Sequence, residues 1–319
     1  MRLIEGLDAL RALDLQAIYG DTPASRSVVA VGVFDGVHLG HQRLLHELLE
    51  MASRLQGMPT VVTFANHPDQ VLRGQAPEPL CSVPQRLRLL RRAGVLRLVL
   101  LQFEPRLQNL TARQFATELL VERLHTRGLL LGYDSALGKD RAGTPAHFAE
   151  LGTELGFEVH TGAPFLVDGH AVSSTAIRKA IAAGDLALAQ RFLGRPPGAM
   201  GTVVHGDGRG KGLGFPTANV RPQPGALPPN GVYAVEVMLD GSNRPGVANL
   251  GARPTFAGGD SEARHLEVHL LDFAGDLYGK ELEVAFRQFL RPERRFDDAT
   301  ALREQIARDV AAARAVASA

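Results

Sequence analysis

The sequence has few of the features that mark secreted, membrane-spanning or nucleic-acid-binding proteins. Its single cysteine, Cys81, excludes an internal disulfide and predicts a reducing, cytoplasmic environment. No apolar run approaches the ~20 residues that a transmembrane helix needs, and residues 1–6 lack the apolar core of a signal peptide. Net charge is only +1, so no basic or acidic tail predicts nucleic acid or membrane as a partner. The oligomeric state is left open.

The rest of the composition is that of a globular protein, with 45% hydrophobic and 22% charged residues. A chain of 319 residues is long enough for two domains with separate cores. Residues 194–198 read Gly-Arg-Pro-Pro-Gly, which neither a helix nor a strand tolerates well. We therefore predict one domain over residues 1–194 and a second over residues 199–319.

Strand-like and helical patterns alternate in the first part. The strand-like runs are 28–33, 59–64, 96–101, 128–132 and 157–161, and the helical patterns are 41–56, 83–93, 111–125, 145–155, 174–183 and 186–193. This alternation predicts an α/β fold, a parallel sheet with helices on both faces and ligands at the carboxyl ends of its strands.

The pattern of the second part is different, because no helix separates its strand-like runs. These runs are 201–205, 231–239, 245–250, 264–271 and 281–287, which predicts a small antiparallel β-barrel. The chain ends in an amphipathic helix, with Asp297 or Asp298 as its N-cap. Leu302, Ile306 and Val310 form its apolar stripe, which we expect to pack against the barrel.

The most informative stretch is 32–42, which places His38 and His41 where an apolar strand turns into a helix. Unpaired N–H groups and the helix dipole make such a helix start a prepared anion site. Gly36 and Gly40 remove side chains that would hold a phosphate away from the backbone. Both histidines can donate hydrogen bonds to phosphate oxygens, so we predict a nucleotide phosphate site; a histidine metal pair is the alternative.

A second polar run lies late in the same part, at Ser173, Ser174 and Thr175, with Arg178 in the first turn of the helix that follows. Hydroxyls and a forked cation at a helix start can bind the outgoing phosphates of a triphosphate. Taken alone, such a hydroxyl run is more often an ordinary helix N-cap, which is the alternative reading.

Together these motifs resemble the adenylyltransferase domain of the bifunctional bacterial riboflavin kinase/FMN adenylyltransferases, or FAD synthetases. The matching residues are Gly32, 34–38, 40–42, 63–64, 67–68, Gly132, Asp134, Gly138, Arg141, Gly143, 173–175, 177–178 and 193–196.

This resemblance implies a Rossmann-like nucleotidyltransferase domain in which the FMN phosphate attacks the α-phosphorus of ATP and pyrophosphate leaves. His38 and His41 would hold ATP phosphates, and the hydroxyl run with Arg178 would grip the pyrophosphate. The other cofactor-binding residues that the resemblance implies are Gly32, Phe34, Asp35, Gly40, Phe64, His67 and Asp134. A phosphate monoester is already anionic, so catalysis rests on alignment and charge stabilisation rather than on a base.

The chain departs from the family pattern in the segment 134–138. Ser135 and Leu137 replace two phenylalanines that are usual there, whose faces would be expected to stack on a flavin ring. Tyr133 and Phe64 are the aromatic residues that could take over this contact. Val33 and Asn66 are two further departures.

The second part opens with a glycine-rich segment that runs from Gly206 to Gly214, with glycine at every other position. Its backbone N–H groups can wrap around phosphates, and Arg209 and Lys211 add positive charge. Gly-Phe-Pro-Thr-Ala-Asn follows, in which Thr217 and Asn219 alternate on one face of a strand and present oxygens suited to Mg²⁺. A mobile hairpin loop is the alternative reading of the glycines.

From this segment to its end, the chain resembles the riboflavin kinase domain of the same family. The matching residues are 201–219, 229–233, 246–251, 253–256, 266–269, 272–273, 278–280, 289–291, Glu293 and Phe296. The resemblance implies a compact β-barrel that phosphorylates the ribityl 5′-hydroxyl of riboflavin with MgATP. ATP is thus the co-substrate of both parts and Mg²⁺ the metal, with Thr217 and Asn219 as its ligands.

Glu267 occupies the position of the family's base, which a neutral alcohol nucleophile can use. His265 and His269 flank it at two-residue spacing, so a His-Glu-His metal site or a polar face without chemistry are alternatives. Arg291 is predicted to contact phosphate or to close over the site.

The leading prediction is therefore a bifunctional enzyme that converts riboflavin to FMN and FMN to FAD. Its ligands would be riboflavin, FMN, FAD and ATP. One alternative is a kinase with a weakened or redirected adenylyltransferase half, and another is a flavin- or nucleotide-sensing binding protein. Intact His41, Thr217, Asn219 and Glu267 favour an enzyme, because a binding protein needs no base.

Overall fold

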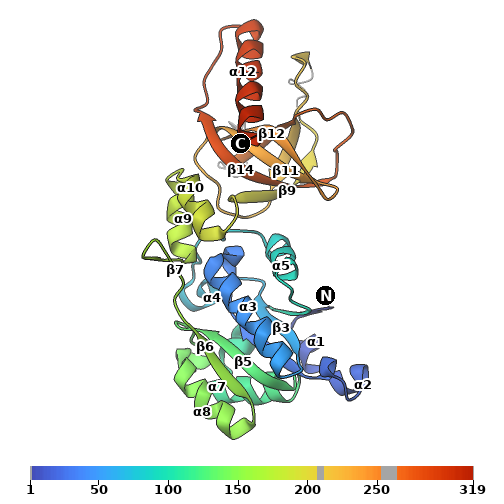
Figure 1. Cartoon of the computed structure of the whole chain (residues 1–319), viewed down its shortest axis with the longest axis vertical. Helices are drawn as coiled ribbons and strands as arrows, with labels where there is room; N and C mark the ends of the chain where they lie inside the picture. Colours follow the sequence, from blue (N-terminus) through green and yellow to red (C-terminus); the bar gives the residue numbers. More distant parts are fainter. Residues whose placement is uncertain (1, 207–211, 253–263, 319) are drawn as a thin grey trace. The chain divides into compact units, whose positions relative to one another are not determined.

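The computed structural model describes residues 2–206, 212–252 and 264–318 (Figure 1). Contacts divide the chain into two compact units, which we call the first and the second unit. The first unit comprises Met1–Pro77 and Val83–Ser173, and the second comprises Glu78–Ser82 and Ser174–Ala319. The unit boundary lies upstream of the sequence break at 194–198, because α9 (Ser174–Ala182) and α10 (Leu186–Leu193) belong to the second unit.

A six-stranded parallel sheet forms the centre of the first unit, with strand order β1-β4-β3-β2-β5-β6. The strands are β1 (Arg2–Glu5), β2 (Ser27–Val31), β3 (Met58–Phe64), β4 (Arg97–Leu101), β5 (Thr126–Gly132) and β6 (Glu158–Gly162). The predicted α/β fold with a parallel sheet is confirmed. Strand β1 was not predicted; only Ile4 of its four residues is buried, which is too little for a strand pattern.

Helices cover both faces of this sheet. The α3 helix (Leu39–Arg54) packs so closely on β5 that a Cβ on Gly128 would lie 2.7 Å from Met51 Cε. On the other face, Leu129 and Leu131 share a core cluster with Leu119 and Leu120 of the π-helical turn η3 (Phe115–Val121). The other α-helices of this unit are α1 (Leu7–Arg11), α2 (Leu15–Tyr19), α4 (Pro68–Arg73), α5 (Val83–Arg92), α6 (Pro105–Gln108), α7 (Ala112–Gln114) and α8 (Pro145–Leu155). Strands β7 (Leu166–Val167) and β8 (His170–Ala171) form a separate hairpin.

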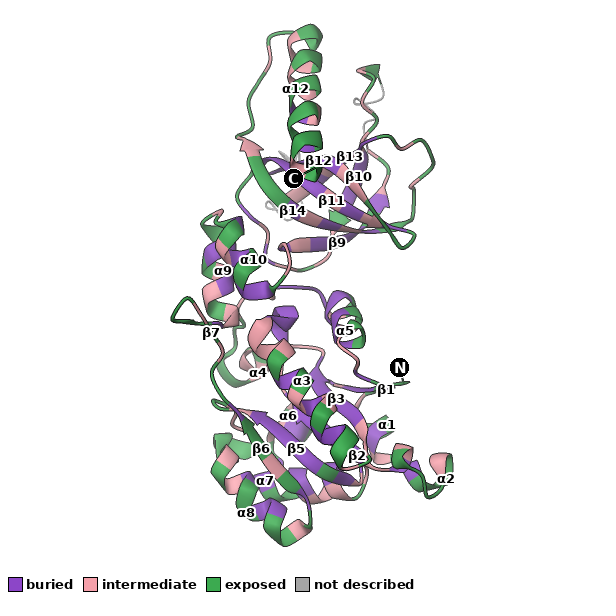
Figure 2. Cartoon of the chain, in the orientation of Figure 1, coloured by how far each residue is buried: buried purple, intermediate pink, exposed green. Residues whose placement is uncertain are grey.

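The second unit contains a closed antiparallel barrel with strand order β10-β13-β12-β11-β14-β9, which confirms the predicted barrel. Its strands are β9 (Gly198–Val204), β10 (Ala218–Pro222), β11 (Gly231–Leu239), β12 (Ser242–Ala252), β13 (Arg264–Leu270) and β14 (Glu281–Arg291). Buried and partly exposed residues alternate along β13, where Leu266 and Val268 lie in the core (Figure 2). Ala218 and Val220 of β10 belong to the same core. Leu186 of α10 joins this core.

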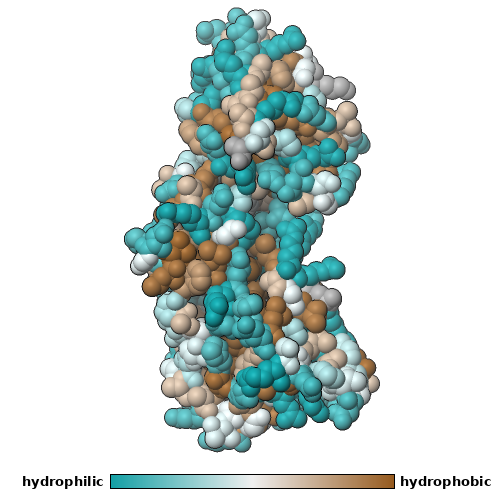
Figure 3. Space-filling view, viewed as in Figure 1, coloured by the Kyte–Doolittle hydropathy of each residue, from teal (hydrophilic) through white to brown (hydrophobic). Residues whose placement is uncertain are grey.

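Helix α12 (Ala299–Ala317) is the predicted terminal helix, and Asp298 is its N-cap. The Asp298 side chain accepts a hydrogen bond from the Ala301 N–H at 2.8 Å. Val310 of the predicted stripe packs with Ala313 and Val316 against the outer face of β11 and β12. Charged and polar side chains cover much of the visible surface of α12 (Figure 3).

Candidate active sites

In the first unit, His38 and His41 lie together at the carboxyl end of β2. Their rings stack with centroids 3.6 Å apart and an interplanar angle of 15°. His38 is the N-cap of α3, and its Nδ1 accepts a hydrogen bond from the His41 N–H at 3.3 Å. The predicted pair at a helix N-terminus is therefore present, and this helix end is suited to bind an anion.

A strained turn between β2 and α3 carries this pair. Phe34 and Val37 adopt left-handed backbone conformations with φ of 52° and 41°, and Gly36 has φ of 74°. A left-handed conformation is unfavourable for a β-branched residue such as Val37, so the surrounding structure must impose it. Gly40 lets the His38 ring lie close, because a Cβ there would be 3.2 Å from His38 Cε1. Such strain is typical of functional sites.

Burial controls the protonation of His41. Desolvation is the main effect that holds the pKa of His41 well below its usual value of 6.5, and the charges of His38 and Arg86 lower it further. His41 is thus neutral near pH 7. A neutral imidazole has one N–H donor and one acceptor nitrogen.

The other predicted ligand-binding residues of the first unit lie around the carboxyl edge of the sheet. Phe34 and Asp35 are buried in the strained turn, and a Cβ on Gly32 would lie 3.2 Å from the Phe34 ring. His67 is the N-cap of α4 and accepts a hydrogen bond from the Asp69 N–H. Asp134 is exposed just beyond β5.

The aromatic residues of this edge differ in exposure. Phe64 is 6% exposed and packs edge-on against Phe103, with ring centroids 5.8 Å apart. Tyr133 is 50% exposed, and Leu137 packs against the core. Of the two aromatic residues considered for a flavin contact, Tyr133 has the accessible face.

The hydroxyl run lies where the chain passes from the first unit to the second. Ser173 is the last residue of the first unit, and Ser174 begins α9 in the second. Thr175 is exposed, and Arg178 Nε donates a hydrogen bond to the Glu78 carbonyl at 2.6 Å. That these residues bind pyrophosphate stays a prediction from the sequence.

In the second unit, strand register places three polar residues in one row across the barrel. Asn219 of β10 is the cross-strand partner of Glu267 on β13, and Glu267 is the partner of Asn249 on β12. Directly opposed residues of antiparallel strands point to the same side of a sheet. Because the flanking residues 218, 220, 266 and 268 fill the core, this row lies on the outer face.

His265 connects the proposed metal ligand to the proposed base. Its Nε2 lies 2.7 Å from Asn219 Oδ1 and 3.2 Å from Glu267 Oε1. His269 does not join them in a metal site: its Nδ1 lies 2.8 Å from the Pro216 carbonyl, and its ring meets Phe215 edge-on. Among the described residues, no group of three or more His, Cys, Asp or Glu side chains is arranged to hold a metal ion.

Gly206, the first residue of the glycine-rich segment, lies beside this row. The backbone of Gly206 lies so close to the Asn219 amide that a Cβ at residue 206 would overlap it. Gly214 has φ of 86°, which favours glycine, and Thr217 directly precedes β10. Lys211 and Arg209 lie outside the described residues.

Arg291 is engaged in an ion pair with helix α12. Its Nε and Nη2 donate three hydrogen bonds of 2.8–3.1 Å to the Asp309 carboxylate. The two side chains are 18% and 6% exposed. A role of Arg291 in phosphate binding stays a prediction, and in this structure its guanidinium fastens α12 to β14.

Sequence reasoning did not single out Asn249 and Glu293 as site residues. Asn249 Nδ2 donates to Glu293 Oε1 at 3.2 Å, and the buried Asn249 Oδ1 has no hydrogen-bond partner among the described residues. The Glu293 carboxylate fills the space where a Cβ of Gly251 would be. The alternation of Asn249 and Gly251 along β12 was the available signal, but only the strand register pairs Asn249 with Glu267 and Gly251 with His265.

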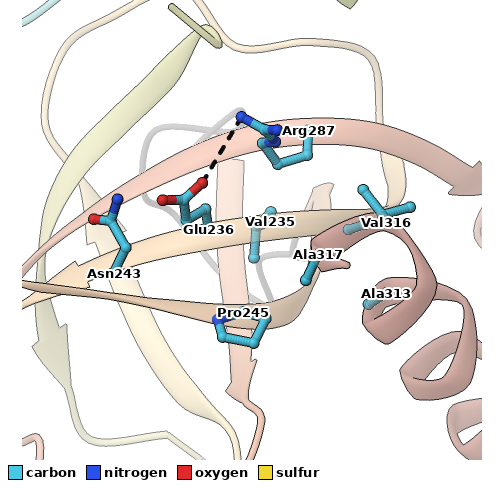
Figure 4. Close-up of a pocket in the computed structure, with 9 residues that line it drawn as sticks. Val235, Glu236, Asn243, Pro245, Arg287, Ala313, Val316 and Ala317 are labelled. Atoms are coloured by element: carbon cyan, nitrogen blue, oxygen red, sulfur yellow. Dashed lines mark ion pairs between the residues drawn. The ribbon is translucent and has the colours of Figure 1, made fainter. Parts of the chain in front are cut away.

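A separate pocket of about 210 Å³ lies between the end of α12 and strands β11, β12 and β14 (Figure 4). Ala313, Val316 and Ala317 line it on the helix side, and the Arg287–Glu236 ion pair of 3.8 Å lies at its polar edge. None of the predicted site residues lines it, so it is distinct from the row that contains Glu267.

Family models match both parts of the chain. The FAD synthetase model matches residues 21–176, and the riboflavin kinase model matches residues 193–317.

Similar proteins match over nearly the full length. A Pseudomonas fluorescens protein named bifunctional riboflavin kinase/FMN adenylyltransferase is 45% identical, over 100% of this chain and 98% of that protein. A protein of the same name from Escherichia coli K12 is 40% identical over 98% and 97%. A solved structure from Streptococcus pneumoniae, named macrolide-efflux protein, has a TM-score of 0.83 and 30% identity over 98% and 99%. In the part of the chain that the structure describes, no helix has the length and apolarity to span a bilayer. The chain belongs to the family of bifunctional riboflavin kinase/FMN adenylyltransferases.

Proposed function

We propose that the chain divides its two activities between the two parts seen in sequence and fold: the histidine pair serves FMN adenylyltransferase, and the barrel serves riboflavin kinase. The observation that supports the kinase assignment is the row Asn219–Glu267–Asn249, with the backbone of Gly206 packed against the Asn219 amide. The row combines amide oxygens with a carboxylate on one face of the barrel.

In the kinase reaction, Glu267 acts as the base. Its side chain is 43% exposed and can therefore reach a substrate hydroxyl. The carboxylate accepts the proton of the ribityl 5′-hydroxyl, the oxygen forms a bond to the γ-phosphorus of ATP, and the bond to ADP breaks. His265 contacts both Glu267 and Asn219 and keeps the two side chains in a fixed relation. The products are FMN and ADP.

The residues near this row fit a magnesium ion. Magnesium prefers hard oxygen ligands, and the Asn219 amide oxygen and the Thr217 hydroxyl are donors of this kind. The amide oxygen of Asn249, which has no hydrogen-bond partner among residues 2–206, 212–252 and 264–318, is a further oxygen on the same face. When bound, Mg²⁺ would neutralise charge on the ATP phosphates, as it does in phosphoryl transfer generally.

In the adenylyltransferase reaction, the nucleophile is the phosphate of FMN, which needs no base. An oxygen of this phosphate forms a bond to the α-phosphorus of ATP, and the bond to pyrophosphate breaks. The N–H groups at the start of α3 and the histidine pair stabilise the charge that develops. The neutral state of His41 makes it a hydrogen-bond donor rather than a counter-ion.

Two variants test this division of labour. We expect Glu267→Gln to abolish FMN formation from riboflavin and MgATP while FAD formation from supplied FMN continues. His41→Ala should have the opposite effect, with loss of FAD and pyrophosphate formation and an intact kinase. The products are separated by chromatography after incubation of the purified full chain, with and without Mg²⁺.

The two variants control one another, because each leaves the other proposed site untouched. If both activities fall together in either variant while circular dichroism shows an intact fold, the proposed division is wrong. Retention of FMN formation in Glu267→Gln would remove Glu267 as the base.

A further inference from the structure

A buried arginine lies behind the histidine pair and belongs to none of the motifs found in the sequence. Arg86, on helix α5, is 6% exposed. Its Nη1 donates a hydrogen bond of 2.8 Å to the carbonyl of Val33, and its Nη2 donates to the carbonyl of Phe64. A guanidinium can make both contacts at once because its donors form a rigid fork.

The two carbonyls lie where the active-site turn begins. Phe64 ends β3, and Val33 lies just beyond β2 and directly precedes Phe34, the first left-handed residue of the strained turn. The Val33 carbonyl also accepts a hydrogen bond of 3.0 Å from Thr63 Oγ1. The carbonyl of Val33 belongs to the peptide that enters Phe34, so these hydrogen bonds fix the direction in which the chain enters the turn.

Arg86 also acts on the pair through its charge. Helix α5 packs against the turn η2 (Asp35–Val37), and the Arg86 cation, after burial and His38, lowers the pKa of His41. A charge-assisted hydrogen bond to a strand-end carbonyl is stronger than a neutral one. One side chain therefore contributes to the shape of the turn and to the electrostatics of the ring that it carries.

We infer that Arg86 is a positioning residue for adenylyl transfer, which acts on His38 and His41 through the carbonyls of Val33 and Phe64. This inference rests on the proposed role of the histidine pair. Because Arg86 is buried, we assign it a positioning role rather than a contact with a substrate. Removal of the Arg86 side chain should shift the two histidine rings slightly. Small displacements of active-site groups reduce reaction rates steeply.

The test compares Arg86→Met, which removes the positive charge and both hydrogen-bond donors, with Arg86→Lys, which keeps the charge. In the full-length protein we expect Arg86→Met to lower kcat of FAD formation on the order of 100-fold with KM for ATP and FMN little changed. We expect Arg86→Lys to recover at least about tenfold of this loss, because one ammonium can still reach a carbonyl. FMN formation from riboflavin serves as the internal control and should stay within about twofold of wild type in both variants.

Arg91 provides a matched control, because it is an exposed arginine on the same helix. Arg91→Gln should leave both activities within about twofold of wild type. A second readout is the ¹⁵N signal of the His41 imidazole during a pH titration. The midpoint should move upward in Arg86→Met, because a nearby cation is lost, and remain low in Arg86→Lys.

A folded Arg86→Met variant with wild-type kcat would overturn the inference. So would equal losses in the methionine and lysine variants with an unchanged His41 titration, since Arg86 would then only stabilise the fold. If Arg86→Met does not fold, Arg86→Lys decides: a lower kcat at unchanged KM supports the inference, and wild-type kcat overturns it. His41→Ala, measured in parallel, distinguishes a failure of the proposed function from a failure of the role assigned to Arg86. Retained FAD formation in His41→Ala contradicts the proposed function, whereas its loss there with wild-type kcat in Arg86→Met contradicts only the role of Arg86.

Discussion

Replacement of Asp309 by asparagine should weaken the attachment of helix α12 to strand β14. In the structure, Arg291 and Asp309 form a bidentate ion pair, and Gln305 Nε2 donates a further hydrogen bond of 2.8 Å to Asp309. Asp309→Asn removes the negative charge and leaves the mostly buried guanidinium with only weaker neutral acceptors.

The size of the effect follows from the burial of the pair. Breaking a fully buried ion pair by removing one partner costs about 3–5 kcal/mol. Because the Arg291 side chain is 18% exposed, water can solvate it in part, and we expect a loss near 2–3 kcal/mol (order-of-magnitude). The double variant Arg291→Met/Asp309→Asn leaves no buried charge, so its loss should be smaller than the sum of the losses in Arg291→Met and Asp309→Asn by about 2 kcal/mol.

Hydrogen exchange measured by mass spectrometry is suited to this cycle, because it reports on the second unit separately. The free energy of opening is read from peptides of β11 and β14, with peptides of β2 and β5 in the first unit as the control. A loss below about 0.5 kcal/mol in Asp309→Asn, or additive losses in the double variant, would refute the reasoning.

Kinase assays on the same variants test the other predicted role of Arg291, which is phosphate binding. If Arg291 only fastens α12, both single variants remain active while folded; if it binds phosphate, Arg291→Met alone loses activity.

Two further predictions concern the two sites. Gly206→Ala should lower kcat/KM of FMN formation on the order of 100-fold, because the new methyl group overlaps the Asn219 amide. Gly225→Ala is the matched control, because the nearest atom to a new Cβ there is 3.6 Å away. It should leave kcat/KM unchanged in the same steady-state assay. The low pKa of His41 predicts a pH dependence of stability. Below about pH 6.5 the unfolded state binds a proton that the native state excludes. The free energy of unfolding is therefore highest above this pH and decreases as the pH is lowered, by at most about 1.4 kcal/mol per pH unit. Urea unfolding of wild type and His41→Gln at pH 5 to 8 checks this, and an equal slope in both proteins would contradict it.

The sequence predicted the elements whose patterns are long and regular. The five predicted strands of the sheet and the five of the barrel correspond to strands in the structure, and Asp298 is the cap of the last helix. Short elements such as β1, α1 and α6 escaped because four or five residues carry too little periodicity to separate a helix or strand from a loop. In 111–125, a helical pattern gave no sign of the π-helical turn η3.

The sequence predicted those residues of the candidate sites that belong to recognisable motifs. The approach of His38 and His41 follows from their spacing at a helix start, and Thr217, Asn219 and Glu267 follow from the family resemblance. Asn249 and Glu293 lie among the residues that match the family, but the pairing of Asn249 with Glu267 and its hydrogen bond to Glu293 are tertiary contacts, which no local pattern contains. Arg86 shares its helix with Arg88, Arg91 and Arg92, and only the packing of α5 distinguishes a buried arginine from exposed ones.

The position of Glu267 in the middle of a closed barrel strand limits how this enzyme can change. Its neighbours on β13, Leu266 and Val268, point into the core, so a single inserted or deleted residue in that strand would turn the carboxylate inward and a leucine or valine outward. Such a one-residue shift in strand register would disrupt both the barrel core and the proposed active site. Variation that alters substrate choice is therefore expected in the loops that border the row, whereas the strand itself tolerates only replacement in place.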